Sequence, residues 1–193
     1  MINYYQLHDD KQNGRTDARH PMAFWSANMS LRELMLQDLA GALAIVRDGR
    51  EVVPAWRILT PEGDFLILTR FDPDKPDQRE RILALVPRFM AWKMATAFVL
   101  TADTWLGPER ARSGEEAVLA VGVSRTERLG VIRRIRRTPG LVFMPPEWLR
   151  AEALDENYFR LLPSGQSNVT TEEAAMLAAM FGEGGELPAR QLS

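Results

Sequence analysis

The amino-acid sequence predicts an α+β fold in which helices cover one face of a mainly antiparallel, five-stranded sheet, in the order α-β-β-α-β-β-β-α. Two observations support this prediction. A capping signal at Ser30 is followed by apolar residues at helical spacing. Several short apolar runs then follow one another with only turn residues between them, and short connections join antiparallel strands. We expect a single domain over residues 30–181, a flexible N-terminal arm over 1–29 and a mobile tail over 182–193.

The first predicted helix begins at a capping box, Ser30-Leu31-Arg32-Glu33, in which the serine hydroxyl and the glutamate carboxylate each accept a hydrogen bond from a backbone amide. Gly49 follows the last apolar position and favours a helix end there. The apolar residues form one stripe along this helix: Leu31, Leu34, Met35, Leu39, Leu43 and Val46.

Two short strands, 52–59 and 64–69, are predicted next, because their apolar runs flank a Thr-Pro-Glu-Gly turn. Pro54 cannot donate a hydrogen bond to a neighbouring strand, which favours an edge position or a strand start. A second helix is predicted after the loop 72–77. Pro87 lies inside this helix and should kink it or divide it into two pieces.

Three further strands are predicted from β-branched and aromatic runs at 97–105, 117–124 and 129–136, and the last two should pair as a hairpin. The Pro-Pro-Glu-Trp segment 145–148 should open a short helix or an irregular stretch. A final helix, capped by its two threonines, is predicted within 170–181.

The order of elements over about residues 30–137 is similar to that of small uncharacterised proteins of bacteria and their phages. The features that carry this resemblance are a helix, a hairpin, a second helix, and a strand that ends in Asp103-Thr104-Trp105 before another hairpin. The resemblance implies no known activity.

The composition excludes several classes of function. The net charge of −2 gives no overall attraction to nucleic acid or to a membrane. Without cysteine there is no thiolate nucleophile, disulfide or thiolate zinc site, and the only two histidines, His8 and His20, lie within the first twenty residues. No apolar run is long enough to span a membrane, and the first residues do not resemble a secretory signal, so we expect a cytoplasmic protein.

A run of arginines in the predicted hairpin 117–136 is the strongest local charge. Guanidinium groups on a strand can contact phosphates, which makes nucleic-acid binding one hypothesis. However, the segment 147–193 is acidic and can neutralise the arginines, and no aromatic residues are interleaved with them for base stacking. We therefore favour a structural or protein-binding role for these residues: Arg125, Arg128, Arg133, Arg134, Arg136 and Arg137.

Carboxylates supply the only catalytic candidates. Asp103 precedes Trp105 on the same predicted strand face, and an acid beside an indole can act as a general acid or base with a raised pKa. Glu115 and Glu116, across the next turn, are candidates for a second carboxylate. The more common role for such residues is structural. We expect no cofactor and no bound metal.

Apolar residues outside the predicted core favour a non-enzymatic protein–protein interaction module that forms a homodimer. The final helix is apolar on nearly all sides, so it is buried either against its own sheet or against another subunit. A small-ligand binder or enzyme that uses carboxylates and arginines is the alternative, and nucleic-acid binding is the third possibility. The candidate interface residues are Phe24, Trp25, Trp148, Met176, Met180 and Phe181.

Overall fold

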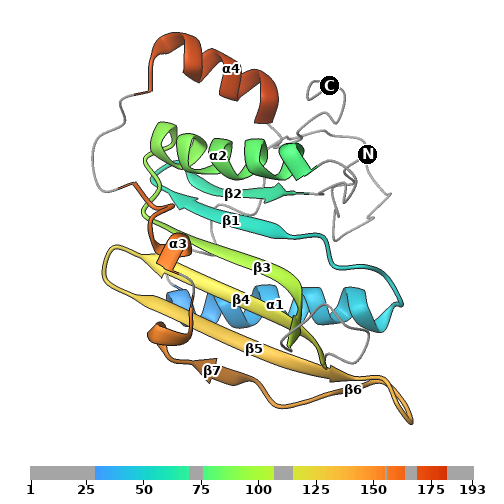
Figure 1. Ribbon diagram of the computed structural model, residues 1–193. Helices are drawn as coiled ribbons and strands as arrows, with labels where there is room; N and C mark the ends of the chain where they lie inside the picture. Colours follow the sequence, from blue (N-terminus) through green and yellow to red (C-terminus); the bar gives the residue numbers. More distant parts are fainter. Residues whose placement is uncertain (1–28, 70–75, 107–114, 155, 164–168, 182–193) are drawn as a thin grey trace, which may run out of the picture.

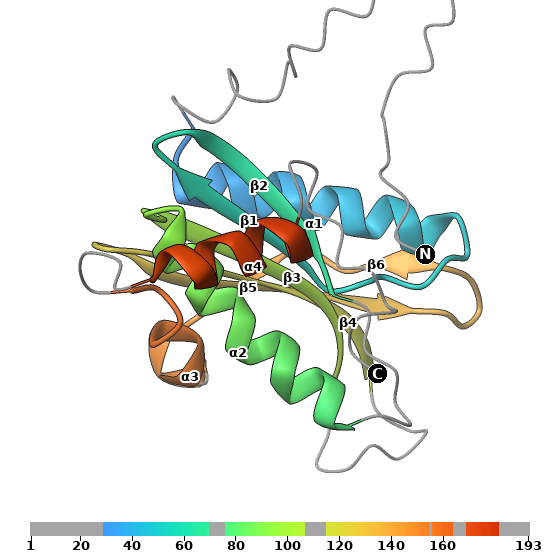
Figure 2. The ribbon, with the colours of Figure 1, turned by 90° about the horizontal axis from the view of Figure 1, so that it is seen from above.

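The computed structural model describes residues 29–69, 76–106, 115–154, 156–163 and 169–181. In this part of the chain, seven antiparallel strands form one sheet, and helices lie on both of its faces (Figures 1 and 2). The predicted α+β class and the antiparallel sheet are therefore confirmed, whereas the predicted number of strands and the placement of the helices need correction.

The described elements follow the predicted order, with additional short elements before the last helix. They are α1 (Leu31–Arg47), β1 (Ala55–Thr60), β2 (Gly63–Leu68), α2 (Pro76–Trp92), β3 (Ala97–Leu106), β4 (Glu115–Ser124), β5 (Arg128–Arg136), β6 (Val142–Phe143), β7 (Glu147–Leu149), the 3-10 turn η3 (Ala151–Ala153), α3 (Glu156–Phe159) and α4 (Thr171–Phe181). The strand order is β2-β1-β3-β4-β5-β6, and β7 also pairs with β5.

The two strands missing from the prediction are β6 and β7. Ile135 of β5 pairs with Phe143, and Val131 of β5 pairs with Trp148, so both short strands lie along the same side of β5. The expected short helix or irregular segment at 145–148 is thus wrong in part, because Glu147 begins a strand. Strands of two and three residues are too short to show an alternating pattern, and they form because β5 offers unpaired backbone groups.

The expected placement of all helices on one face is also wrong. α1 packs on the face that carries Val99 and Val118, whereas α2 packs on the face that carries Phe98 and Val121. The sequence of the central strands explains this arrangement. Residues 97–100 are apolar without alternation, which is the pattern of a strand that is buried on both faces.

The start of α1 follows the predicted capping box. The Oγ of Ser30 accepts a hydrogen bond from the Glu33 amide at 3.3 Å, and the Ser30 amide donates to the Glu33 carboxylate at 2.8 Å. The helix then lies very close to β4, because a Cβ atom on Gly122 would meet the Sδ of Met35 at 2.5 Å. Glycine at this position lets α1 pack directly on the sheet.

The second helix, α2, is not divided at its proline. It runs continuously through Pro87 to Trp92. Val86, Phe89 and Met90 are buried in the core on that side of the sheet. Packing on both sides of the proline therefore keeps one helix, so of the two predicted outcomes, a kink or a division, the division is wrong.

Candidate functional site

The final helix, α4, is tied to the rest of the fold by two contacts. Leu177 is fully buried in the core that α2 also covers. Arg88 of α2 forms an ion pair with Glu173. Glu173 also completes a capping box, because its amide donates to the Oγ1 of Thr170 at 3.2 Å and its carboxylate accepts from the Thr170 amide at 3.1 Å. These contacts attach α4 to α2 and to the core on that side of the sheet.

Most of the apolar surface of α4 nevertheless faces outward. Met176 is 43 % exposed, and Ala175, Ala178 and Ala179 are exposed as well. Ala179 lies four residues after Ala175 and three after Met176, so these residues share one side of the helix. We call these three residues the α4 stripe. Among the described residues of α4, Leu177 alone is buried, although the composition of the helix is typical of burial on all sides.

The other predicted interface residues have different surroundings. Trp148 of β7 packs against the α1 side of the core, and the guanidinium of Arg32 lies 4.0 Å from the centre of its ring. Part of the Trp148 ring is thus covered by contacts within the chain. Phe24 and Trp25 lie outside the described residues. The side chains at positions 180 and 181 of α4 also lie outside what the structure describes.

The predicted arginine cluster is divided between the two faces of the sheet. Side chains alternate along β5, and Val131 belongs to the core beneath α1, so Arg133 and Arg137 lie on the α1 side. The opposite face carries Arg128, Arg134 and Arg136. The described arginines therefore do not form one continuous surface.

At least three arginines of the predicted cluster form contacts within the chain. Arg134 forms ion pairs with Glu115 at 3.0 Å and with Glu147 at 3.3 Å. Arg137 donates two hydrogen bonds of 2.6 Å to the carboxylate of Glu116.

The third, Arg133, donates from Nε to the carbonyl oxygen of Met144 at 2.7 Å. These contacts hold β4, β5 and the segment after β6 together, so these arginines have a structural use.

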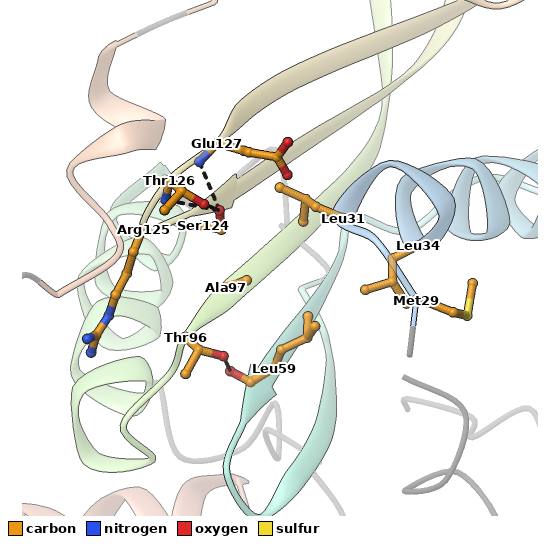
Figure 3. A pocket seen from close by; sticks show the side chains of 10 residues that line it. All are labelled: Met29, Leu31, Leu34, Leu59, Thr96, Ala97, Ser124, Arg125, Thr126 and Glu127. Carbon is orange, nitrogen blue, oxygen red and sulfur yellow. Dashed lines mark hydrogen bonds between the residues drawn. The ribbon is translucent and has the colours of Figure 1, made fainter. Parts of the chain in front are cut away.

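A hollow of about 360 Å³ lies beside the β4–β5 turn, where Arg125 is found (Figure 3). A polar side chain in its lining is already hydrogen-bonded to the nearby backbone, because the Oγ of Ser124 accepts from the amides of Thr126 and Glu127. The Arg125 side chain extends away from the apolar lining in Figure 3. The hollow is lined by Met29, Leu31, Leu34, Leu59, Thr96, Ala97, Ser124, Arg125, Thr126 and Glu127. It offers an apolar surface rather than converging charged groups.

A second pocket, of about 240 Å³, lies at the end of α1 and collects charged side chains. It contains the predicted acid Asp103 and the predicted arginine Arg137, together with residues from the segment that follows α1. Its lining consists of Val46, Gly49, Arg50, Glu51, Val52, Asp103, Glu116, Val118 and Arg137. We call it the acidic pocket.

The carboxyl group of Asp103 has an altered acidity in the acidic pocket. Burial raises its pKa above the ordinary value, and the negative charges of Glu51 and Glu116 raise the pKa further. Glu115, the other predicted acid, lies on the opposite face of the sheet, because neighbouring residues of β4 point to opposite sides. Asp103 is therefore grouped with Glu116 and not with Glu115.

Sequence reasoning missed Glu51 and Arg50 in this pocket. Both follow the predicted end of α1 at Gly49, and a charged pair just after a helix stop has no distinctive pattern. The only available signal is that α1 must return to the sheet there, which places its C-terminal loop near the strand ends.

No family model matches the chain, and neither a curated protein nor a solved structure is significantly similar to it. In the part of the chain that the structure describes, no three acidic or histidine side chains are grouped so that they could hold a metal ion. No described helix combines the length and the apolar character that a membrane span requires.

Proposed function

We propose that the protein is a non-enzymatic interaction module that forms a homodimer through the α4 stripe. The observation that supports this proposal is the exposure of Ala175, Met176 and Ala179 on a helix with few polar residues. A second copy would remove this apolar surface from water, and methionine adapts well to an interface. The cytoplasmic location expected from the sequence belongs to the same proposal.

Met176→Lys is the direct test. A lysine in the stripe would place a charge in an apolar interface, so we expect the dimer dissociation constant to rise at least about tenfold. The melting temperature measured where the chain is monomeric should change little, because Met176 is largely exposed. Sedimentation velocity across a concentration series measures the dissociation constant.

The matched control for this change is Val142→Lys, which alters a 48 % exposed residue of β6 at the opposite end of the sheet. Figure 1 shows α4 and β6 on opposite ends of the molecule. An equal loss of dimer in both variants, or no loss in Met176→Lys, would contradict a role for the α4 stripe.

A second candidate function is supported by the acidic pocket. Burial, and after it the charges of Glu51 and Glu116, disfavour the carboxylate form of Asp103, and a ligand with a positively charged amine would relieve the repulsion between these carboxylates. Arg137 already neutralises Glu116 through its paired hydrogen bonds. The pocket could therefore bind a small organic amine, with the carboxylates of Asp103 and Glu51 as its partners.

Asp103→Asn tests this second function and has a defined pH dependence. The folded protein holds the Asp103 proton more tightly than the unfolded chain does, so stability falls as the pH rises from the ordinary pKa through the raised pKa. Above that window, Asp103→Asn should be more stable than the original protein, by less than about 1 kcal/mol because Asp103 is exposed. The difference should disappear at lower pH.

The same variant should abolish any thermal stabilisation by simple diamines and monoamines. Chemical denaturation at several pH values and thermal melts with these amines provide the measurements. A destabilised Asp103→Asn protein at neutral pH, or an amine effect that survives the substitution, argues against an amine site here.

Nucleic-acid binding through the arginines stays a prediction. Arg133 and Arg137 lie on one face of the sheet, whereas Arg134 lies on the other. This arrangement does not favour nucleic-acid binding, because a protein surface that follows a phosphate backbone needs its cations on one side.

A further inference from the structure

The two edges of the sheet differ in how they are protected. One edge is formed by β6 and β7, which are two and three residues long and are separated by Pro145 and Pro146. Short strands and prolines are common devices that prevent pairing with another chain. The other edge is β2, which has six residues, contains no proline or lysine, and reads Gly-Asp-Phe-Leu-Ile-Leu. Among the described residues, no strand pairs with the outer side of β2.

The hydrogen-bond alternation shows which backbone groups of β2 face outward. The amide of Thr69 donates to the carbonyl of Pro54 at 2.8 Å, so this pair is hydrogen-bonded across the β1–β2 ladder. Hydrogen-bonded pairs recur at every second position in an antiparallel ladder. The backbone groups of Phe65 and Ile67 therefore face β1. Those of the alternate residues, Asp64, Leu66 and Leu68, face the open edge.

The outer edge of β2 carries little exposed charge. The carboxylate of Asp64 is 7 % exposed and lies 3.7 Å from the guanidinium of Arg57. Leu66 and Leu68, on the same side of the sheet, are half-buried. Because the one carboxylate of β2 is buried beside a guanidinium, two such edges can approach each other with little like-charge repulsion.

The sequence of β2 is also complementary to itself in one register. If two copies pair antiparallel about a twofold axis at Leu66, then Leu66 faces its own copy and Asp64 faces Leu68 in two equivalent pairs. Each of these pairs exchanges two hydrogen bonds, so every outward group finds a partner. On the other face of the sheet, Phe65 then lies opposite Ile67, and an aromatic residue beside a β-branched one is a favourable cross-strand pair.

We propose that β2 pairs with β2 of a second copy about a twofold axis at Leu66, so that the two sheets become one continuous antiparallel sheet. This inference rests on the proposed homodimer and names the backbone contacts that form it. Figure 1 shows β2 and α4 at the same end of the molecule, away from β6 and β7, so the helix that carries the α4 stripe lies at the end where the second copy would bind. The proposed partner is thus a second copy of this chain.

Amide hydrogen exchange of the full chain tests the pairing residue by residue. At concentrations where the dimer forms, the amides of Asp64, Leu66 and Leu68 should exchange at least about tenfold more slowly than after dilution to monomers. The amides of Phe65 and Ile67 face β1 and are the matched controls, so their protection should be the same at both concentrations.

The outcomes separate this inference from the proposed function. Rapid exchange of the outward amides in a sample that is dimeric by light scattering would overturn β2 pairing and leave the homodimer intact. Protection that persists after dilution would also overturn it, because a segment of the same chain would then cover the edge. A chain that stays monomeric at every concentration would overturn both.

A charge exchange at the twofold axis tests the register. In Leu66→Lys and in Leu66→Glu, like charges would face each other at the axis, so each variant alone should dimerise at least about tenfold more weakly. An equimolar mixture should regain a stable heterodimer, because lysine then faces glutamate. Undiminished dimerisation of either variant alone, or no recovery in the mixture, would contradict pairing at Leu66.

Discussion

Phe89→Ala is expected to lower the free energy of unfolding by about 4 kcal/mol, because it opens a cavity between α2 and the sheet. Phe89 is 2 % exposed. Its ring packs edge-on against Phe65 of β2 at a centroid distance of 5.5 Å and against Trp92 at 5.7 Å. The alanine variant loses both ring contacts, and the backbone around them can close the space only in part. The melting temperature should fall by roughly 10 °C for a chain of this size.

Chemical denaturation at fixed protein concentration measures this effect, because dimerisation would otherwise change the apparent stability. Phe143→Ala is the matched control, since Phe143 is half-buried on β6 and contacts the guanidinium of Arg47 at 5.5 Å. Phe143→Ala should lower the free energy of unfolding by no more than about half as much as Phe89→Ala does. A loss below about 1 kcal/mol in Phe89→Ala would show that the α2 core is packed differently.

Arg57→Met is expected to lower the free energy of unfolding by about 3 kcal/mol, because it leaves two carboxylates without their shared cation. Arg57 on β1 donates to Asp38 of α1 at 2.6 Å and lies 3.7 Å from Asp64 of β2. These two carboxylate side chains are only 13 % and 7 % exposed. Burial alone lowers the pKa of Arg57, but hydrogen bonds and charge attraction to Asp38 and Asp64 outweigh it and raise the pKa.

The control for this change is Arg160→Met, which removes an ion pair with Glu156 whose side chains are 77 % and 84 % exposed. It should change stability by less than about 1 kcal/mol. Replacing Asp38 and Asp64 by leucine in the Arg57→Met background should restore most of the lost stability, because no unpaired charge then remains. Equal losses in Arg57→Met and Arg160→Met would show that the buried network does not stabilise the fold.

Local signals in the sequence predicted the elements well where those signals were complete. The helices that follow the caps at Ser30 and Thr170 start as expected, because each cap is formed by residues only three positions apart. The β4–β5 hairpin also follows the prediction. The placement of the helices was predicted wrongly, although the apolar run 97–100 lacks the alternation that a strand with one exposed face would show.

The candidate site was predictable only in part, because it depends on residues that are distant in sequence. Asp103 was identified from its strand position. Its proximity to Glu51 could not be predicted, because it depends on the return of the chain to the sheet after α1. The arginine run could be seen in the sequence, whereas the division of its members by strand alternation required the register of β5. The exposure of Met176 could be recognised only from the structure, which shows that Leu177 is the described residue of α4 that packs into the core.

The mass of the full chain, measured by multi-angle light scattering from low to high micromolar concentration, tests the proposed homodimer most directly. We predict a rise from the mass of one chain to twice that mass, with the transition moved to higher concentration by Met176→Lys. A mass equal to one chain at every concentration would contradict the proposed function.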